Sequence, residues 1–271
     1  MEVKMMEVAG KIVVVTGGAG GIGYGLCRRF AREGAKAVIV ADVNEAGAKA
    51  VAGEIKGAAV TCDVRKEEDI IRLVRFTEET FGPIDLFCSN AGIIVLGGVD
   101  VVNDDWQRIW EINVLAHVYA ARAVIPRMIK RGGGAFLITA SAAGLLSQIG
   151  SAPYSTTKHA AMGLAENIAI TYGNQGIKVF ALCPQAVRTE MTRQGGGVAA
   201  LDGLMEPGQL AEAVIEGLRR EEFLILPHPE VRTYMQRKTA DYDRWIQGMR
   251  RLQARFIQGA PLKSGRAPGH E

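Results

Sequence analysis

Aromatic residues, prolines and cysteines are scarce in this chain of 271 residues. Aromatic side chains make up 6% of the sequence, and there are 9 prolines and 4 cysteines. The cysteines show neither a C-x-x-C pair nor metal-ligand spacing, which argues against a disulfide scaffold and predicts small buried side chains in a reduced compartment. They are Cys27, Cys62, Cys88 and Cys183.

Strong charge and long apolar runs are lacking as well. The 32 basic and 29 acidic side chains leave a net charge of +3, so the composition does not predict nucleic-acid binding. No apolar run approaches the ~18 residues of a membrane span, and the N-terminus lacks the basic-then-apolar layout of a signal peptide. These absences predict a cytoplasmic protein without membrane association.

Glycine, in contrast, is abundant. There are 33 glycines in the chain, about 12% against an average usage of roughly 7%. They have no three-residue period, and hydrophobic residues reach 48%, which excludes collagen-like and disordered chains. The glycine excess therefore needs a local explanation.

Short β-branched runs alternate with longer helical patterns along most of the chain. This alternation predicts parallel strands whose connecting helices cover both faces of one sheet. Strands are predicted at residues 12–16, 37–41, 59–62, 84–89, 135–139, 179–183 and 223–226, and helices include residues 23–32, 67–81, 104–125 and 154–172. The sequence thus predicts an α/β fold with a doubly wound parallel sheet, a Rossmann fold, in a single domain over residues 8–227.

Three segments depart from the alternation. Residues 190–206 form a glycine-rich stretch too long for an ordinary connection, which predicts a substrate loop inside the domain. Residues 228–257 predict a helical C-terminal extension, whose basic side chains are interpreted as a solvated face rather than a membrane-binding one. Residues 258–271 have the composition of a disordered tail.

A glycine cluster follows the first predicted strand and opens a helix. Glycines at this place let the backbone approach a pyrophosphate, which the helix N-terminus attracts. Asp42 ends the second strand, where a carboxylate accepts ribose hydroxyls and repels a 2′-phosphate, so NAD is predicted over NADP. The residues assigned to this half of the cofactor are Gly17, Gly20, Gly21, Ile22, Gly23, Asp42 and Val43.

Tyr154 and Lys158 are four residues apart, so they share one face of a helix. An ammonium one turn away stabilises a phenolate, as does the positive charge of an oxidised nicotinamide. Together these charges are expected to bring the tyrosine towards neutral pH, where it can act as a general acid or base. Ser141 ends the strand that precedes this helix and is expected to lie close to Tyr154.

The order and spacing of these motifs resemble the short-chain dehydrogenase/reductase family, in its short single-domain branch. The resemblance runs over roughly residues 10–190. It rests on T-G-G-A-G-G-I-G at 16–23, Asp63-Val64, Asn90-Ala91-Gly92, Asn113, Ser141, Tyr154-S-T-T-Lys158 and Pro184-Q-A-V-R-Thr189.

The resemblance implies a role for each matching position. It makes Tyr154 the catalytic acid/base, with Lys158 lowering its pKa and binding the nicotinamide ribose. Ser141 would position the substrate oxygen, and Asn113 would distort its helix and support a proton relay. The remaining cofactor contacts would be Asp63 and Val64 at adenine, Asn90, Ala91 and Gly92 at the adenine-side ribose, and Val187 and Thr189 at the nicotinamide carboxamide, with Pro184 as a further cofactor contact.

Two positions depart from the family pattern. Gln185 stands where family members usually have glycine, and Ser89 stands where they usually have asparagine. Gln185 adds a polar side chain next to the expected substrate site. The residues assigned to substrate are Val95, Ala143, Gln148, Gln185 and Met191, in a mainly apolar or neutral lining.

The sequence therefore predicts an NAD-dependent enzyme that interconverts a hydrophobic secondary alcohol and its ketone. Two alternatives stay open: a ketoreductase that uses NADPH, and an NAD-binding regulatory protein without turnover. No metal site is predicted, since His159 and His228 lack companions at ligand spacing. The resemblance further implies a homodimer or homotetramer.

Overall fold

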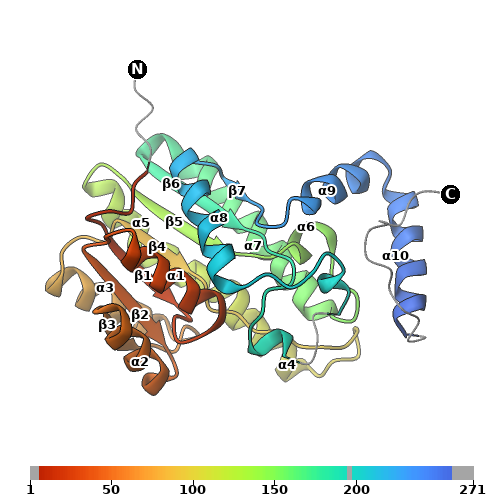
Figure 1. Cartoon of the computed structure of the whole chain (residues 1–271), viewed down its shortest axis with the longest axis horizontal. Helices are drawn as coiled ribbons and strands as arrows, with labels where there is room; N and C mark the ends of the chain where they lie inside the picture. Colours follow the sequence, from red (N-terminus) through yellow and green to blue (C-terminus); the bar gives the residue numbers. More distant parts are fainter. Residues whose placement is uncertain (1–5, 194–196, 258–271) are drawn as a thin grey trace.

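The computed structural model describes residues 6–193 and 197–257. It holds a seven-stranded parallel sheet in the order β3-β2-β1-β4-β5-β6-β7, as Figure 1 shows. The strands are β1 (Ile12–Thr16), β2 (Ala37–Asp42), β3 (Ala58–Thr61), β4 (Leu86–Ser89), β5 (Gly134–Thr139), β6 (Ile177–Leu182) and β7 (Leu224–Ile225). The predicted doubly wound α/β fold is confirmed, and each predicted strand matches an observed one to within two residues at either end.

Helices cover both faces of the sheet, so the side chains on both faces of the central strands are buried. Every residue of β1 is buried, as expected for a central parallel strand. Val13 and Val15 pack in one apolar layer and Val14 in the other. The first layer includes side chains of α1 (Gly21–Arg32), α2 (Glu45–Ile55) and α8 (Pro207–Arg220), and the second those of α3 (Glu67–Thr80), α5 (Ala116–Lys130) and α7 (Ala152–Tyr172).

The helix predicted over residues 104–125 is interrupted. It consists of α4 (Asn103–Trp110), a π-helical turn at Glu111–Leu115 and α5. The π-turn contains Asn113. Its side-chain amide forms hydrogen bonds with the backbone of Ile93, in the loop after β4. A π-turn of this kind often marks a functional position.

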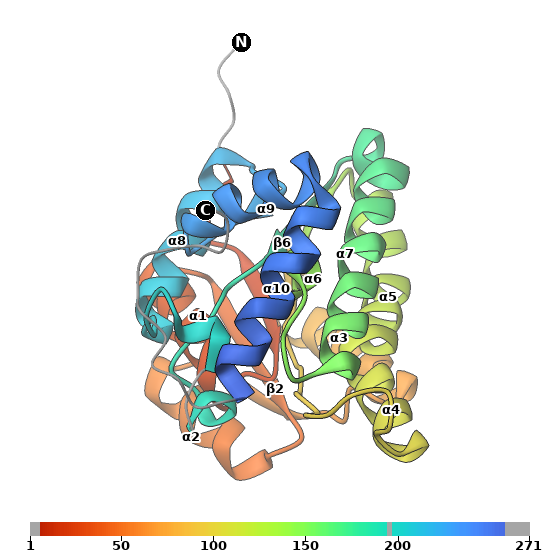
Figure 2. The same cartoon turned by 90° about the vertical axis from the view of Figure 1, so that its right-hand side faces the viewer.

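The C-terminal part forms two helices, α9 (Glu230–Ala240) and α10 (Tyr242–Ile257). The helical pattern breaks at Asp241, which is extended and caps α10 by accepting the N–H of Arg244 at 2.9 Å. Figure 2 shows α10 crossing in front of the sheet between the two helical layers. The predicted domain limits, 8–227 and 228–257, stay predictions, and the tail predicted at 258–271 lies outside the described residues.

A small apolar cluster joins these helices to the main body. Val231 of α9 and Trp245 of α10 are buried against Ala142 and Leu146. Leu146 belongs to α6 (Ala143–Leu146), the short helix that follows Ser141. The extension is therefore attached to the segment that leads from Ser141 rather than to the sheet itself.

All four cysteines are buried and free, as the sequence predicts. Burial raises the pKa of the Cys27, Cys62 and Cys183 thiols to about 12. Within residues 6–193 and 197–257, no helix combines the length and the apolar character needed to cross a membrane.

Candidate active site

The candidate site lies where the carboxyl ends of the central strands meet. β1 pairs with β2 on one side and β4 on the other, so the order of strands reverses there. Ligands of doubly wound sheets bind outside the carboxyl ends at this point. The glycine cluster follows β1, Asn90 follows β4, Ser141 follows β5 and Pro184 follows β6.

The glycine loop allows approaches that any side chain would block. A Cβ at Gly23 would lie 2.0 Å from the carbonyl oxygen of Gly17, and Gly17 itself has a φ of +66°. A Cβ at Gly21 would lie 2.9 Å from Cγ2 of Thr189, so the loops after β1 and β6 touch. Gly20 precedes α1 without a side-chain cap, and the first turn of α1, which includes Ile22, carries no acidic residue.

Asp42 lies against this glycine loop. Its carboxylate accepts the backbone N–H of Ala19 at 3.0 Å and that of Asn44 at 2.9 Å. The side chain of Val43 is 68% exposed beside it. The carboxylate is thus fixed next to the loop that begins α1.

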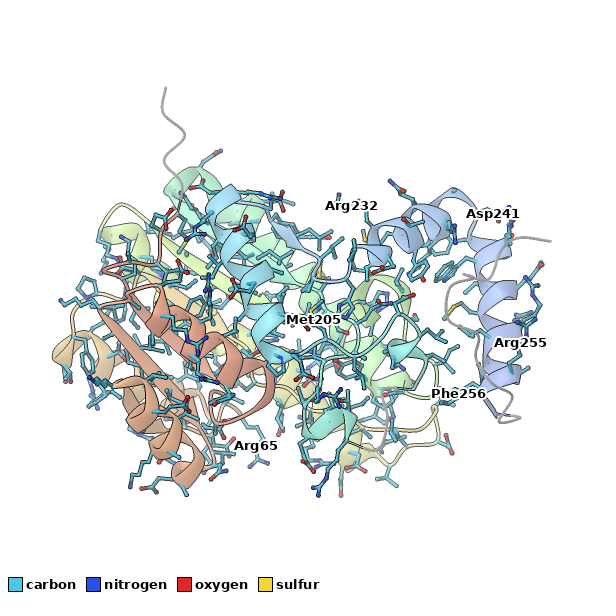
Figure 3. All side chains as sticks on the ribbon, viewed as in Figure 1. Arg65, Met205, Arg232, Asp241, Arg255 and Phe256 are labelled. Carbon is cyan, nitrogen blue, oxygen red and sulfur yellow. The ribbon has the colours of Figure 1, made fainter. Side chains whose placement is uncertain are left out.

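Asp63 has a partner that the motif alone does not reveal. Arg65 Nη2 lies 2.7 Å from its carboxylate, and this guanidinium holds the pKa of Asp63 below its ordinary value. Val64 is buried. Figure 3 shows Arg65 near the edge of the molecule, on the β3 side.

Asn90 connects the ends of three strands. Its side-chain amide donates to the carbonyl of Thr16 at 2.9 Å, and its oxygen accepts the hydroxyl of Thr139 at 2.9 Å. The backbone N–H groups of Asn90 and Ala91 both donate to Thr16 Oγ1. The end of β4 is consequently fixed between β1 and β5.

Asn113 ties the π-turn to the loop after β4. Its side chain exchanges two hydrogen bonds of 2.9 Å with the backbone of Ile93 and donates to Thr157 Oγ1 at 3.2 Å. A Cβ at Gly92 would lie 3.3 Å from Asn113 Oδ1 and 3.4 Å from Lys158 Nζ. The structure therefore brings Asn113, Gly92 and Lys158 together.

Tyr154 and Lys158 share one face of α7, as their spacing predicts. The Lys158 ammonium is 5.6 Å from the centre of the Tyr154 ring and donates to the Thr139 carbonyl at 2.9 Å. Lys158 is buried, and burial lowers its pKa to about 8.

Opposing effects within the protein act on the pKa of Tyr154. Burial raises it above its ordinary value, and the Ser141 hydroxyl acts in the opposite direction. The expected shift of this pKa towards neutral pH also requires the positive charge of an oxidised nicotinamide, so it stays a prediction. Ser141 Oγ accepts the N–H of Ala143 at 3.1 Å and donates to the Pro184 carbonyl at 3.4 Å.

The segment after β6 carries the other predicted cofactor residues. Val187 is buried, and its carbonyl accepts the Thr192 hydroxyl at 2.7 Å. Thr189 contacts Gly21, as described above. Met205 forms a parallel bridge with Val187, which closes the predicted 190–206 loop at its base; residues 194–196 of that loop lie outside the described ones.

The residues assigned to substrate have unequal exposure. Val95 and Ala143 are buried, and the Val95 carbonyl accepts the Ser151 hydroxyl at 2.5 Å. Gln148 donates its side-chain amide to the carbonyl of Ile149 at 3.2 Å. Met191 is 42% exposed in the 190–206 loop.

Two histidines stand out that sequence reasoning does not assign to the site. His117 Nδ1 lies 2.7 Å from Ser89 Oγ, and burial lowers the pKa of His117 to about 3. His228 Nδ1 accepts the backbone N–H of Gln185 at 3.2 Å. The departures Ser89 and Gln185 were the available signals, but their histidine partners are distant in sequence. Among the described residues, no His, Cys, Asp or Glu cluster could hold a metal ion.

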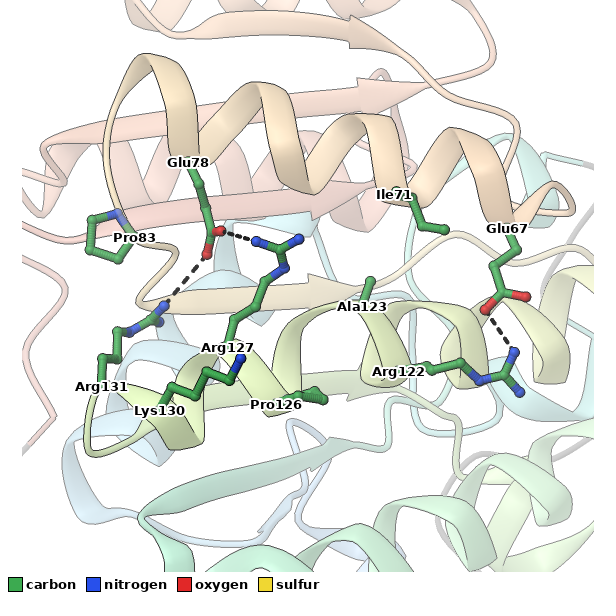
Figure 4. Close-up of a pocket in the computed structure, with 10 residues that line it drawn as sticks. All are labelled: Glu67, Ile71, Glu78, Pro83, Arg122, Ala123, Pro126, Arg127, Lys130 and Arg131. Atoms are coloured by element: carbon green, nitrogen blue, oxygen red, sulfur yellow. Dashed lines mark hydrogen bonds and ion pairs between the residues drawn. The ribbon is translucent and has the colours of Figure 1, made fainter.

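A separate hollow of about 750 Å³ lies between α3 and α5. Figure 4 shows that ion pairs cross it, joining Glu67 to Arg122 and Glu78 to Arg127 and Arg131. None of the predicted catalytic or cofactor residues lines it.

Comparisons with known proteins agree with this geometry. The short chain dehydrogenase family pattern matches residues 11–196. 1-Deoxy-11-beta-hydroxypentalenate dehydrogenase of Streptomyces exfoliatus is 36% identical over 84% of this chain and 86% of that protein. 3beta-Hydroxysteroid dehydrogenase 2 of Eggerthella lenta is 34% identical over 68% of this chain and 74% of that protein.

A solved structure has the same fold over most of its length. A short chain dehydrogenase/reductase from Burkholderia phymatum, in complex with NAD, has a TM-score of 0.81 and 25% identity, covering 88% of this chain and 96% of that one. Fold and sequence together define an oxidoreductase that uses a nicotinamide cofactor on small molecules. The chain belongs to the short-chain dehydrogenase/reductase family.

Proposed function

We propose that this protein is an NAD-dependent oxidoreductase that interconverts a hydrophobic secondary alcohol and its ketone. The observation that carries the proposal is the grouping of Ser141, Tyr154 and Lys158 at the carboxyl edge of the sheet. The Lys158 ammonium lies 5.6 Å from the Tyr154 ring, and the Ser141 hydroxyl acts on the pKa of the same tyrosine.

The residues present fit a dinucleotide. The glycine loop is a cradle that a Cβ at Gly17 or Gly23 would fill, and it leads into an α1 terminus without a side-chain cap. Such a terminus attracts phosphate. The carboxylate of Asp42, held beside the loop, would accept the ribose hydroxyls and repel a 2′-phosphate, which supports NAD over NADP.

We assign the remaining cofactor contacts as the family resemblance implies them. Asp63 and Val64 would meet adenine, although Arg65 already pairs with the Asp63 carboxylate. The loop after β4 would line the adenine-side ribose, and the loop after β6 the carboxamide. The former consists of Asn90, Ala91 and Gly92, and the latter contains Pro184, Val187 and Thr189.

Tyr154 would move the proton of the reaction. A bound nicotinamide would supply the hydride acceptor for oxidation of the carbinol carbon and the hydride donor for reduction of the ketone. The Tyr154 phenolate takes the hydroxyl proton during oxidation and the phenol returns it during reduction, while Ser141 Oγ holds the substrate oxygen. Lys158 supplies a positive charge near the phenolate, and Asn113 positions the loop beside Lys158.

The substrate proposal rests on apolar surroundings. Val95, Ala143 and Met191 offer little charge, and the cluster of Leu146 and Trp245 adjoins the segment after Ser141. The two relatives described above are named for hydroxylated substrates, one of them a steroid. An apolar skeleton bearing a secondary hydroxyl suits this lining. A homodimer or homotetramer and a cytoplasmic location stay predictions of the sequence.

A screen of secondary alcohols for NADH formation tests the proposal. Tyr154→Phe should lower kcat by about 10²–10⁴-fold, because it removes the proton acceptor, while the Kd for NAD stays within a few-fold. Tyr172→Phe, on the same helix, is the matched control and should keep parental turnover. Ordinary activity in Tyr154→Phe would contradict the mechanism. Binding of NAD with no turnover of any alcohol would instead favour the regulatory alternative.

A further inference from the structure

Two buried polar atoms without a hydrogen-bond partner lie on residues that contact each other. They are Gln185 Oε1 and His228 Nε2, two of the four such atoms among the described residues. Gln185 and His228 are joined by the bond from the Gln185 N–H to His228 Nδ1. Buried polar groups are normally paired, so an orphaned acceptor and an orphaned nitrogen on two residues in contact need an explanation.

One peptide unit connects these residues to the catalytic serine. The carbonyl of Pro184 accepts the Ser141 hydroxyl at 3.4 Å, and the N–H of the same peptide, that of Gln185, donates to His228 at 3.2 Å. Peptide dimensions then place His228 Nδ1 at most about 9 Å from Ser141 Oγ. This upper limit applies to Nδ1, and the unpaired Nε2 is on the same ring, so a substrate of up to two rings held at Ser141 is compatible with the spacing.

The chemistry of the two atoms is complementary. Since Nδ1 of His228 accepts a hydrogen bond, the neutral ring carries its proton on Nε2, which is therefore a donor. Burial lowers the pKa of His228 and favours this neutral form, against the opposite effects of Glu230, the Ala186 backbone and Asp202. Gln185 Oε1 is an acceptor, so the pair suits a group that both donates and accepts.

Apolar side chains adjoin His228, and the carboxylates of Glu230 and Asp202 are near enough to act on its pKa. His228 is 4% exposed and lies between Leu226, a neighbour of the apolar cluster, and Val231, a buried member of it. Charged ligands are disfavoured in such a place because burial of an unpaired charge is costly. A neutral hydroxyl can donate to Gln185 and accept from His228 without adding charge.

We propose that Gln185 and His228 form a polar subsite that binds a second hydroxyl group of the substrate, remote from the one that reacts. The substrate class is then a largely apolar diol, or the corresponding hydroxyketone. This inference rests on the proposed function, because Ser141 must hold the reacting oxygen for the spacing to apply. A binding site built to pair a hydroxyl discriminates strongly against analogues that lack it.

A matched pair of substrates tests the subsite. The full chain with NAD is assayed with the two-ring secondary alcohol decalinol and with decalindiol, whose second hydroxyl is on the far ring. We expect kcat/KM to be about tenfold to a hundredfold higher for the diol. Gln185→Leu and His228→Phe should each remove most of this preference, because they should lower kcat/KM for the diol more than kcat/KM for the mono-alcohol. Gln175→Leu, at an exposed position in the 3-10 turn that follows α7, is the control and should keep the preference.

The outcomes separate the two proposals. Turnover of both alcohols with equal kcat/KM overturns the subsite alone, as does a preference that survives both substitutions. Either result would mean that Gln185 Oε1 and His228 Nε2 bind only a structural water. If no alcohol yields NADH, the proposed function fails, and the subsite fails with it. His228→Gln, which returns an amide near the Nε2 position, should restore part of the preference if hydrogen bonding rather than packing is responsible.

Discussion

The carboxylate of Asp42 is oriented in part by the glycine loop that lies beside it. Two backbone N–H groups, of Ala19 and Asn44, fix its carboxylate next to the glycine loop. Each oxygen accepts one of these bonds and keeps lone pairs for another donor. The carboxylate can therefore receive ribose hydroxyls without rearranging.

Asp42→Ala should shift the cofactor preference towards NADP. Removal of the negative charge abolishes repulsion of the 2′-phosphate and also removes the ribose acceptor, so KM for NAD should rise and KM for NADP should fall, each by about tenfold. Steady-state kinetics with both cofactors measure the change. Asp42→Asn, which keeps an acceptor for Ala19, separates loss of charge from loss of the loop contact. An unchanged ratio in both variants would show that Asp42 does not select the cofactor.

The raised pKa of Tyr154 predicts how activity depends on pH. The phenolate is the form that accepts the alcohol proton, so kcat/KM for oxidation should rise with pH and that for reduction should fall. The Ser141 hydroxyl lowers this pKa, so Ser141→Ala should move the rise in oxidation to higher pH as well as slow it. The pH profiles of the parent and the variant test this. A profile that stays in place would assign Ser141 to substrate positioning alone.

At the scale of elements, the conformation of the loop between β1 and α1 depends on close packing of its backbone as well as on the flexibility of its glycines. Gly23→Ala would bring a Cβ to 2.0 Å from the Gly17 carbonyl oxygen, so backbone must move. We expect a lower melting temperature and much weaker NAD binding, since the same backbone forms the cradle. Calorimetry with and without NAD measures both effects.

Gly53 provides the control for this substitution. It lies in α2, is exposed and has no atom within 4 Å of an added Cβ. Gly53→Ala should therefore increase the free energy of unfolding by about 0.5–1 kcal/mol, the usual gain for alanine in a helix interior. Equal destabilisation of the two variants would contradict the packing argument.

The strands were predictable because short β-branched runs such as that of β1 are typical of parallel strands that are buried on both faces. Hydrophobic periodicity did not predict two interruptions of the helices. The helix distortion at Asn113 was implied by the family resemblance instead, and the structure shows it as a π-turn in which Asn113 bonds to Ile93 of a different element. The break at Asp241 is a local capping event inside a continuous apolar pattern. Periodicity reports which face is buried and does not report how the backbone is interrupted.

The candidate site was predictable to the extent that its residues are tied to motifs. Tyr154, Lys158 and Ser141 come together in space as their spacing predicts, and Asn113 lies near Lys158 as the family resemblance implies. His228 was not predictable, because its contact with Gln185 spans β7 and is set by tertiary structure. The burial of Tyr154, which raises its pKa, was not predictable either, since burial cannot be read from spacing.

At the scale of the whole molecule, α10 is held to the body largely by one small apolar cluster. Trp245→Ala should cost about 3–5 kcal/mol of stability where the cavity stays open, and it should release α10 from the segment after Ser141. Denaturant unfolding measures the loss, and the substrate panel measures any change in range. Ile246→Ala, at a neighbouring position that is 45% exposed, is the control and should change neither. Parental stability in Trp245→Ala would show that the cluster does not attach the extension.

Phe256 lies near the other end of α10, and Figure 3 shows it on the inner side of that helix. Its ring is 3.7 Å from where a Gly197 Cβ would stand. Tyr234 of α9 also donates to Asp202 at 3.1 Å. The extension thus contacts the 190–206 loop at two points, so changes in the extension can alter the predicted substrate loop.

The four buried cysteines can report the order in which the two apolar layers of this protein open. Two of them, Cys27 and Cys88, lie in one apolar layer, and Cys62 and Cys183 lie in the other. Only a thiolate reacts with an alkylating reagent, and burial keeps these thiols protonated and covered. Each sulfur can therefore be labelled only while its own layer is open. The order in which the four are labelled records which side of the sheet separates first, with no added probe and no change to the sequence.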